Sequence, residues 1–150
     1  MAQVTTLPNP RVYGFYKVAG ASEPGSYTWT LDAAVTNGGG IARYSGVSTA
    51  SPLDAPVQKS AGTAATSATV PGITAATPGA MVVGCMGPNA APTTFTITSP
   101  AGMTQAWDIG GKRHELADAN QPTPGATGAR TWTFSSAREW AGWLTALRPA

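Results

Sequence analysis

The sequence predicts an all-β protein, an antiparallel β-sandwich of jelly-roll type that forms a single domain over residues 1–150. Only 11% of the residues are charged, while the chain has 18 glycines and 13 prolines. This composition lacks the Leu, Glu and Lys that helix bundles and coiled coils require. Short runs with a period of two alternate with Gly- and Pro-rich turns, the pattern of sandwich strands. A length of 150 residues favours one domain.

Three strands are expected in the first part of the chain. Residues 11–18 are aromatic and β-branched, and they end in a turn-rich stretch at Gly20–Gly25. Residues 27–31 alternate strictly, with Tyr, Trp and Leu on one face and two threonines on the other, as in a half-buried strand. After the glycines at 38–40, residues 41–47 are expected to form the next strand.

Residues 48–80 form a low-complexity run of Ser, Thr, Ala, Pro and Gly. We expect either a long covered loop or one short edge strand near residues 67–70. Further strands are expected at residues 80–86, 93–98, 104–109, 113–117 and 130–134.

Residues 137–147 admit two interpretations. A capping-box pattern at Ser136–Glu139 precedes apolar residues spaced as in an amphipathic helix. However, residues 130–134 repeat the pattern of residues 27–31, which indicates two pseudo-repeated halves. In that repeat, residues 138–148 correspond to the strand after the three glycines, and a glycine triplet is a poor helix former. The repeat therefore favours a strand.

Charge and hydropathy exclude several classes of function. Nine basic and seven acidic residues give a net charge of +2, and the basic residues form no stripe for phosphates, so nucleic-acid binding is not expected. No apolar run approaches the roughly 20 residues of a membrane helix. Residues 1–6 lack the features of a secretory signal. Cys85, within an apolar run, is expected to be a buried small hydrophobe.

No catalytic, cofactor or metal site is predicted. His114 is the only histidine and has no nucleophile or orienting carboxylate nearby in the sequence. One histidine and one cysteine do not suffice for a zinc site. Asp108, Asp118 and Asn120 lack the spacing of a calcium loop. All seven carboxylates lie beside turn or polar residues, where we expect them to be solvated.

The tryptophans are predicted to serve mainly in packing. Trp29 and Trp132 are equivalent in the repeat and alternate with threonine, so we expect both to be buried. Trp140 and Trp143 would fall on opposite faces of one strand. One of them would then meet another sheet or another subunit.

The chain also carries a series of motifs in a distinctive order: residues 15–24, 27–30, 39–47, 52–55, 100–103, 125–130 and 146–149. In these motifs it resembles a β-sandwich module that recurs in phage tail and virion proteins and in secreted proteins of high-GC bacteria. The resemblance covers nearly the whole chain. It implies an architecture and a setting but no reaction, because the family has no well-defined catalytic set.

Modules of this kind usually begin with a further group of strands, whereas this chain starts almost at the strand of residues 11–18. We therefore expect an unpaired sheet edge there, and such edges associate with other chains. The leading hypothesis is a non-enzymatic structural protein of a phage virion, a head decoration or a tail or fibre component, acting as a homo-oligomer or on a capsid or tail lattice. The expected interface residues are Val12, Tyr13, Phe15, Tyr16, Trp140 and Trp143.

The alternative hypothesis is a carbohydrate-binding or adhesive module of a secreted bacterial protein, located outside the cell or at its surface. Trp107 beside Asp108 is the best candidate for a glycan contact, because sugar rings stack on exposed aromatic side chains. An enzyme, in the form of a glycan hydrolase, ranks third. Such a hydrolase would need two carboxylates across a cleft.

Overall fold

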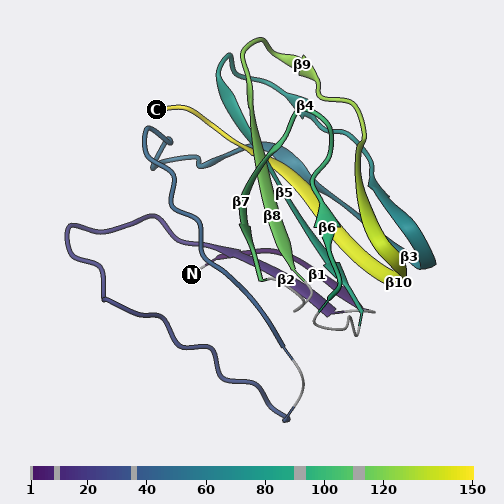
Figure 1. Cartoon of the computed structure of the whole chain (residues 1–150). Helices are drawn as coiled ribbons and strands as arrows, with labels where there is room; N and C mark the ends of the chain where they lie inside the picture. The colour runs from purple at the N-terminus through teal and green to yellow at the C-terminus, as the bar shows by residue number, and fades with distance from the viewer. Residues whose placement is uncertain (1, 9–10, 35–36, 90–93, 110–113) are drawn as a thin grey trace.

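The computed structural model describes residues 2–8, 11–34, 37–89, 94–109 and 114–150 (Figure 1). Within these ranges the chain is all-β and contains no helix, which confirms the predicted fold class. The strands are β1 (Ala2–Pro8), β2 (Arg11–Tyr16), β3 (Leu53–Val70), β4 (Thr74–Ala75), β5 (Ala80–Pro88), β6 (Ile97–Thr98), β7 (Thr104–Asp108), β8 (Glu115–Gln121), β9 (Gly125–Ala126) and β10 (Arg130–Leu147).

The main sheet has the strand order β3-β10-β5-β8-β7, and β6 pairs with the first part of β10. All of these pairings are antiparallel. Strands β1 and β2 form a separate hairpin, and β4 and β9 form a short third pair. The main sheet therefore begins at β3 and ends at β7, with the long β10 directly inside the β3 edge.

Strand β10 changes its neighbour part-way along its length. Phe134 pairs with Ile97 of β6, whereas residues 140–147 pair with β5. On its other side β10 pairs with β3 from Arg130 to Leu147, with register shifts between Thr133 and Trp140. Bulges of this kind bend a strand and increase its twist. The two ends of β10 therefore belong to different parts of the sandwich, the first beside β6 and the second beside β5.

Apolar side chains cover both faces of the main sheet. One core holds Trp132, Phe134, Phe95, Trp140 and Leu144, among others. The other core holds Val12, Val83, Cys85, Leu116 and Trp143. Successive residues of a strand point to opposite faces, so β10 reaches both cores. The prediction that Trp140 and Trp143 lie on opposite faces is thus confirmed, as is the prediction of a strand at residues 137–147.

Residues 48–80 were expected to be a loop or a short edge segment, and this prediction is wrong in extent. Leu53–Val70 form a strand of 18 residues, although it does lie at the edge of the sheet. Its composition is only weakly apolar because much of it is exposed to solvent. The hydrogen-bonding partner β10, rather than side-chain hydrophobicity, makes it a strand.

The strands expected at residues 27–31 and 41–47 are absent, apart from an isolated bridge between Val47 and Pro149. An alternating pattern fixes which side chains share a face, but it does not supply the neighbouring strand that a strand needs. Trp29 is 50% exposed, whereas Trp132 is fully buried. The prediction of equivalent burial is therefore wrong for Trp29.

An unpaired edge was expected at residues 11–18. This expectation is wrong for one side of the strand, because residues 11–16 form β2 and pair with β1. Strands β5, β6, β7 and β8 form near the predicted positions. The expected strand starts at residues 93 and 113 lie outside the described residues.

Two carboxylates are buried, contrary to the expectation that all would be solvated. Glu115 is fully buried and accepts hydrogen bonds from Ser99 Oγ (2.7 Å) and Trp132 Nε1 (3.1 Å). Burial raises the pKa of Glu115, and this effect outweighs those two hydrogen bonds. The sequence could not reveal this burial, because the partners come from residues distant along the chain.

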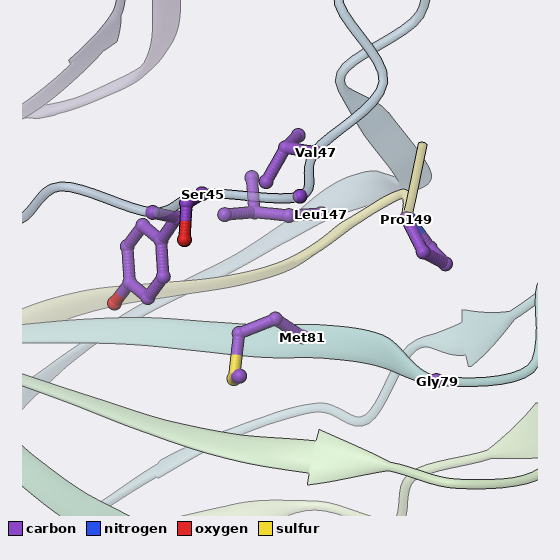
Figure 2. A pocket seen from close by; sticks show the side chains of 8 residues that line it. Ser45, Val47, Gly79, Met81, Leu147 and Pro149 are labelled. Carbon is purple, nitrogen blue, oxygen red and sulfur yellow. The ribbon is translucent and has the colours of Figure 1, made fainter.

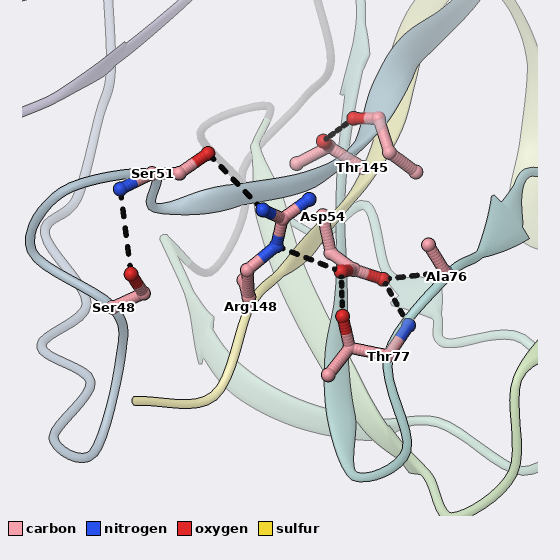
Figure 3. A network of polar contacts seen from close by, with 8 residues as sticks. Ser48, Ser51, Asp54, Ala76, Thr77, Thr145 and Arg148 are labelled. Atoms are coloured by element: carbon pink, nitrogen blue, oxygen red, sulfur yellow. Dashed lines mark hydrogen bonds and ion pairs between the residues drawn. The ribbon is translucent and has the colours of Figure 1, made fainter.

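Asp54 closes a second polar network, which fastens the end of β10 to the start of β3 (Figure 3). It accepts hydrogen bonds from Ala76 N, Thr77 N and Thr77 Oγ1, and Arg148 Nε lies 3.1 Å from its Oδ1. Burial acts to raise the pKa of Asp54, but the bonds from Thr77, Ala76 and Arg148 outweigh it and lower the pKa.

The two matched tryptophans give the first prediction. Trp132→Ala should cost about 3–5 kcal/mol of unfolding free energy, since it empties a buried aromatic site. Trp29→Ala, in the same Thr-Trp-Thr context, should change it by less than about 0.5 kcal/mol. Urea unfolding of both variants measures the difference. Equal losses would contradict the described burial.

Asp54 gives a prediction for pH. Because its pKa is lower in the fold than in the unfolded chain, its stabilising contribution is present above about pH 4 and is lost as pH falls through the folded-state pKa. Asp54→Asn should cost about 1.5–3 kcal/mol at neutral pH, the range for hydrogen bonds to a charged group. That difference from the parent chain should shrink at pH 2–3. Urea unfolding at both pH values measures it, and a difference that does not depend on pH would refute the assignment.

Candidate functional site

Between β2 and β3 the chain makes a long excursion away from the sheets. Residues 17–34 and 37–46, together called the arm, form no strand among the described residues. In Figure 1 the arm extends to the lower left, away from the β3 and β10 edge. It returns where Val47 bridges to Pro149 and Ser48 N donates to the carbonyl of Arg148 at 2.9 Å. Unstructured connections of this length are uncommon in compact domains and are usually either functional or linker segments.

The large exposed hydrophobic side chains all lie in the arm or in the strand just before it. In the described part of the chain they are Tyr13, Phe15, Val18, Trp29, Leu31 and Ile41. Large exposed apolar side chains that gather in one part of a chain are a feature of interaction sites in soluble proteins. The remainder of the described chain places its large apolar side chains in the two cores.

Aromatic side chains pair along this surface. On β2, Val12 points inward and is buried, whereas Tyr13 and Phe15 point outward and stack with ring centroids 6.3 Å apart. In the arm, the rings of Tyr27 and Trp29 lie 6.2 Å apart. These pairs present broad, rigid apolar area at little cost in conformational entropy.

A polar cluster shapes the first part of the arm. Glu23 accepts hydrogen bonds from Lys17 Nζ (2.6 Å), the Gly20 amide (2.6 Å) and the hydroxyl of Tyr27. The bonds from Lys17 and Tyr27 are the main reason that the pKa of Glu23 falls to about 2. The cluster is exposed, so it directs the local path of the chain rather than stabilising the whole fold.

The arm touches the sheet at only a few points. A Cβ atom at Gly40 would lie 2.6 Å from ring atoms of Trp107 on β7, so the backbone there covers one face of the indole. Tyr44 donates a hydrogen bond to Asp118 of β8 at 2.8 Å. Burial, and then this bond, raise the pKa of Tyr44. The arm is therefore held at the β7 end of the main sheet.

An open groove of about 2130 Å³ lies between the arm and the sheet. It is lined by all four tyrosines of the chain and by three of the five tryptophans. Pockets for small molecules measure about 300–1,000 Å³, so this groove has the size of a macromolecular contact. The buried indole N–H groups of Trp107 and Trp143, both in its lining, find no acceptor among the described residues.

A second, much smaller pocket lies where the arm rejoins the sandwich. Figure 2 shows it between Ser45, Val47 and Pro149 on one side and Met81 on the other. Its volume of about 90 Å³ is too small for an organic ligand. The pocket is therefore a packing gap at the root of the arm.

The structure separates the predicted interface residues into two groups. Tyr13 and Phe15 are exposed and Tyr16 is half-buried, so these belong to the surface beside the arm. Val12, Trp140 and Trp143 are buried within the chain, at 1%, 8% and 7% exposure. They therefore build the cores and offer no surface to a partner.

Trp107 and Asp108, the residues predicted as a glycan contact, also differ in exposure. Asp108 is exposed, and partial burial raises its pKa. Trp107 is half-buried, with Gly40 against its ring, so it does not offer an open stacking platform. The exposed residues Trp29, Leu31 and Ile41 were not predicted as surface. Their sequence pattern is that of a buried strand face, and only the missing partner strand reveals their exposure.

Other chemistry is sparse in the described ranges. Cys85 is buried, and burial raises its pKa to about 12, which makes the thiol unreactive. His114 is half-buried and packs against Gly87. No group of three or more His, Cys, Asp or Glu side chains within the described ranges could hold a metal ion. These ranges also contain no helix able to cross a membrane. Comparison with protein-family models, curated proteins and solved structures finds no match.

The contact between the arm and β7 can be tested with neighbouring glycines. Gly40→Ala would place a Cβ against the Trp107 ring and should displace the arm, so trypsin should cut after the exposed Arg43 several-fold faster. Gly39→Ala is the matched control, because its Cβ would meet nothing within 4 Å. Equal cleavage rates in the two variants would contradict the described position of the arm.

Proposed function

We propose that this chain is a non-enzymatic structural protein that acts by protein–protein assembly, as a head decoration or as a tail or fibre component of a phage virion. The observation that carries the proposal is the arm, which keeps its large apolar side chains in solvent although the rest of the described chain is well packed. Exposure of such side chains costs free energy that only a partner recovers.

Three properties of the chain support an assembly role over a catalytic one. The groove beneath the arm is too large for a small substrate. The buried carboxylates Asp54 and Glu115 are tied into hydrogen bonds that fasten strands together. The exposed surface consists of aromatic and aliphatic side chains, which dominate the energy of protein interfaces. The virion setting rests on the resemblance of the motifs to modules of phage tail and virion proteins.

A second candidate function is carbohydrate binding. The exposed rings of Trp29 and of the Tyr13–Phe15 pair favour it, since sugars stack on such faces. A glycan array distinguishes the two functions: glycan signal that is lost in Trp29→Ala, from a chain that stays monomeric, would favour the sugar-binding module. The covered face of Trp107 counts against the glycan contact expected from the sequence.

The assembly role predicts that the arm determines association. Trp29→Ser with Leu31→Ser should weaken association by about 30-fold or more, because a tryptophan central to an interface contributes about 2 kcal/mol or more. Thr28→Ala with Thr30→Ala, on the other face of the same segment, is the matched control and should have little effect.

Sedimentation velocity over a wide concentration range measures this association, with the chain alone and mixed with phage capsid and tail proteins. Urea unfolding of each variant confirms that the fold is retained, as expected for exposed positions. A parent chain that stays monomeric at every concentration and in every mixture would refute the assembly role.

A further inference from the structure

The outer edge of β3 is the least protected backbone of the main sheet. The strand order places β3 at one end of the sheet, so only its β10 side is paired in the described chain. Proteins usually protect edges with charged residues, prolines, bulges or short strands. Pro56 and Lys59 protect the first part of β3. Residues 60–70 contain neither a proline nor a charge, and their only irregularity is the pair of register shifts with β10 between Gly62 and Ser67. This half of a long strand is open to another strand.

The opposite edge is protected. Strand β7 has only five residues, its pairing with β8 has a register shift between Gln105 and Trp107, and it ends in Asp108. The backbone at Gly40 also covers the Trp107 ring. A short, irregular edge with a charge at its end is a poor template for strand addition. An added strand is therefore expected at β3.

The arm contains a segment whose side-chain pattern suits that edge. Residues 27–31 carry the Thr-Trp-Thr sequence that residues 131–133 of β10 use on the inner side of β3. There, Trp132 enters the core, while Thr131 stays exposed and its Oγ1 lies 2.8 Å from Thr69 Oγ1. A strand of residues 27–31 on the outer side of β3 would repeat this arrangement. Its aromatic face would extend the core face, and Thr28 and Thr30 would extend the threonine face.

We propose that residues 27–31 of one chain add as a strand to the β3 edge, residues 60–70, of a second copy of this chain. This inference rests on the proposed assembly function and names its partner. In the described chain residues 27–31 have no strand partner, and β3 has none on the side away from β10. Both therefore carry backbone groups that an added strand can pair, and residues 27–31 also bring an apolar face.

The position of the arm favours a second copy over closure within one chain. Gly40 and Tyr44 hold the arm at β7 and β8, whereas β3 is four strands from β7 and three from β8, about 19 and 14 Å at the usual strand spacing. In Figure 1 the arm lies at the lower left and the β3 and β10 edge at the right. Closure within one chain would require residues 27–31 to cross from the arm's side of the molecule to the opposite edge of the sheet. Because donor and acceptor surfaces differ, the contact is either exchanged reciprocally in a two-fold dimer or repeated head-to-tail in rings or filaments.

Cysteine cross-linking tests this pairing. Thr30→Cys is combined in one chain with either Thr69→Cys or Ser67→Cys, two exposed positions on β3 that pair with Thr131 and Thr133 of β10. Paired strands bring such residues within the Cα distance that a disulfide requires. The native Cys85 is buried and does not compete. Mild oxidation should give covalent dimers and larger species with at least one of the two pairs.

The matched control combines Thr30→Cys with Thr104→Cys on the β7 edge, and it should not cross-link. A cross-link to Thr104, a cross-link within a single chain, or no cross-link at either β3 position would overturn the inference. Sedimentation of the unmodified chain separates this result from failure of the proposed function. A chain that associates without these cross-links leaves the assembly role standing, whereas a chain that never associates overturns both.

Discussion

The fold depends above all on the pairing of β10. This strand is hydrogen-bonded to β3 on one side and to β6 and then β5 on the other, and it carries tryptophans into both cores. Trp132 adds a hydrogen bond to the buried carboxylate of Glu115 on β8. Just beyond β10, Arg148 pairs with Asp54 of β3, so the end of the strand is fastened as well. A substitution that disrupts the pairing of β10 would therefore disturb the packing on both faces of the main sheet.

The same pairing explains why β3 is a strand and why the arm is not. Residues 60–67 of β3 bury little, and they are ordered because β10 offers a backbone ladder along them. Residues 27–31 have a more typical strand sequence, yet the described chain provides no neighbour for them. Partner availability, and not intrinsic preference, separates these two segments. The arm thus keeps the apolar face of a strand without the hydrogen bonds of one.

The sequence was sufficient to predict the all-β class, the antiparallel strands near β5 and β7, and a strand at residues 137–147 against its helical pattern. It failed at residues 27–31 and 53–70, because pattern and composition do not reveal which segment finds a partner. The residues expected at the interface differ in burial for the same reason. Tyr13 and Phe15 are exposed to solvent, while Trp140 and Trp143 are buried in cores that only long-range strand pairing creates. Burial of Asp54 and Glu115 also depends on partners distant along the chain.

If residues 27–31 of the arm form an intermolecular strand, hydrogen–deuterium exchange should depend on protein concentration. Backbone amides exchange slowly only when they are hydrogen-bonded. On concentration, amides of residues 27–31 and of residues 60–70 should become protected together, while those of β5, already paired on both sides, should not change. Arm amides that exchange equally fast at every concentration, with no change along β3, would contradict the account.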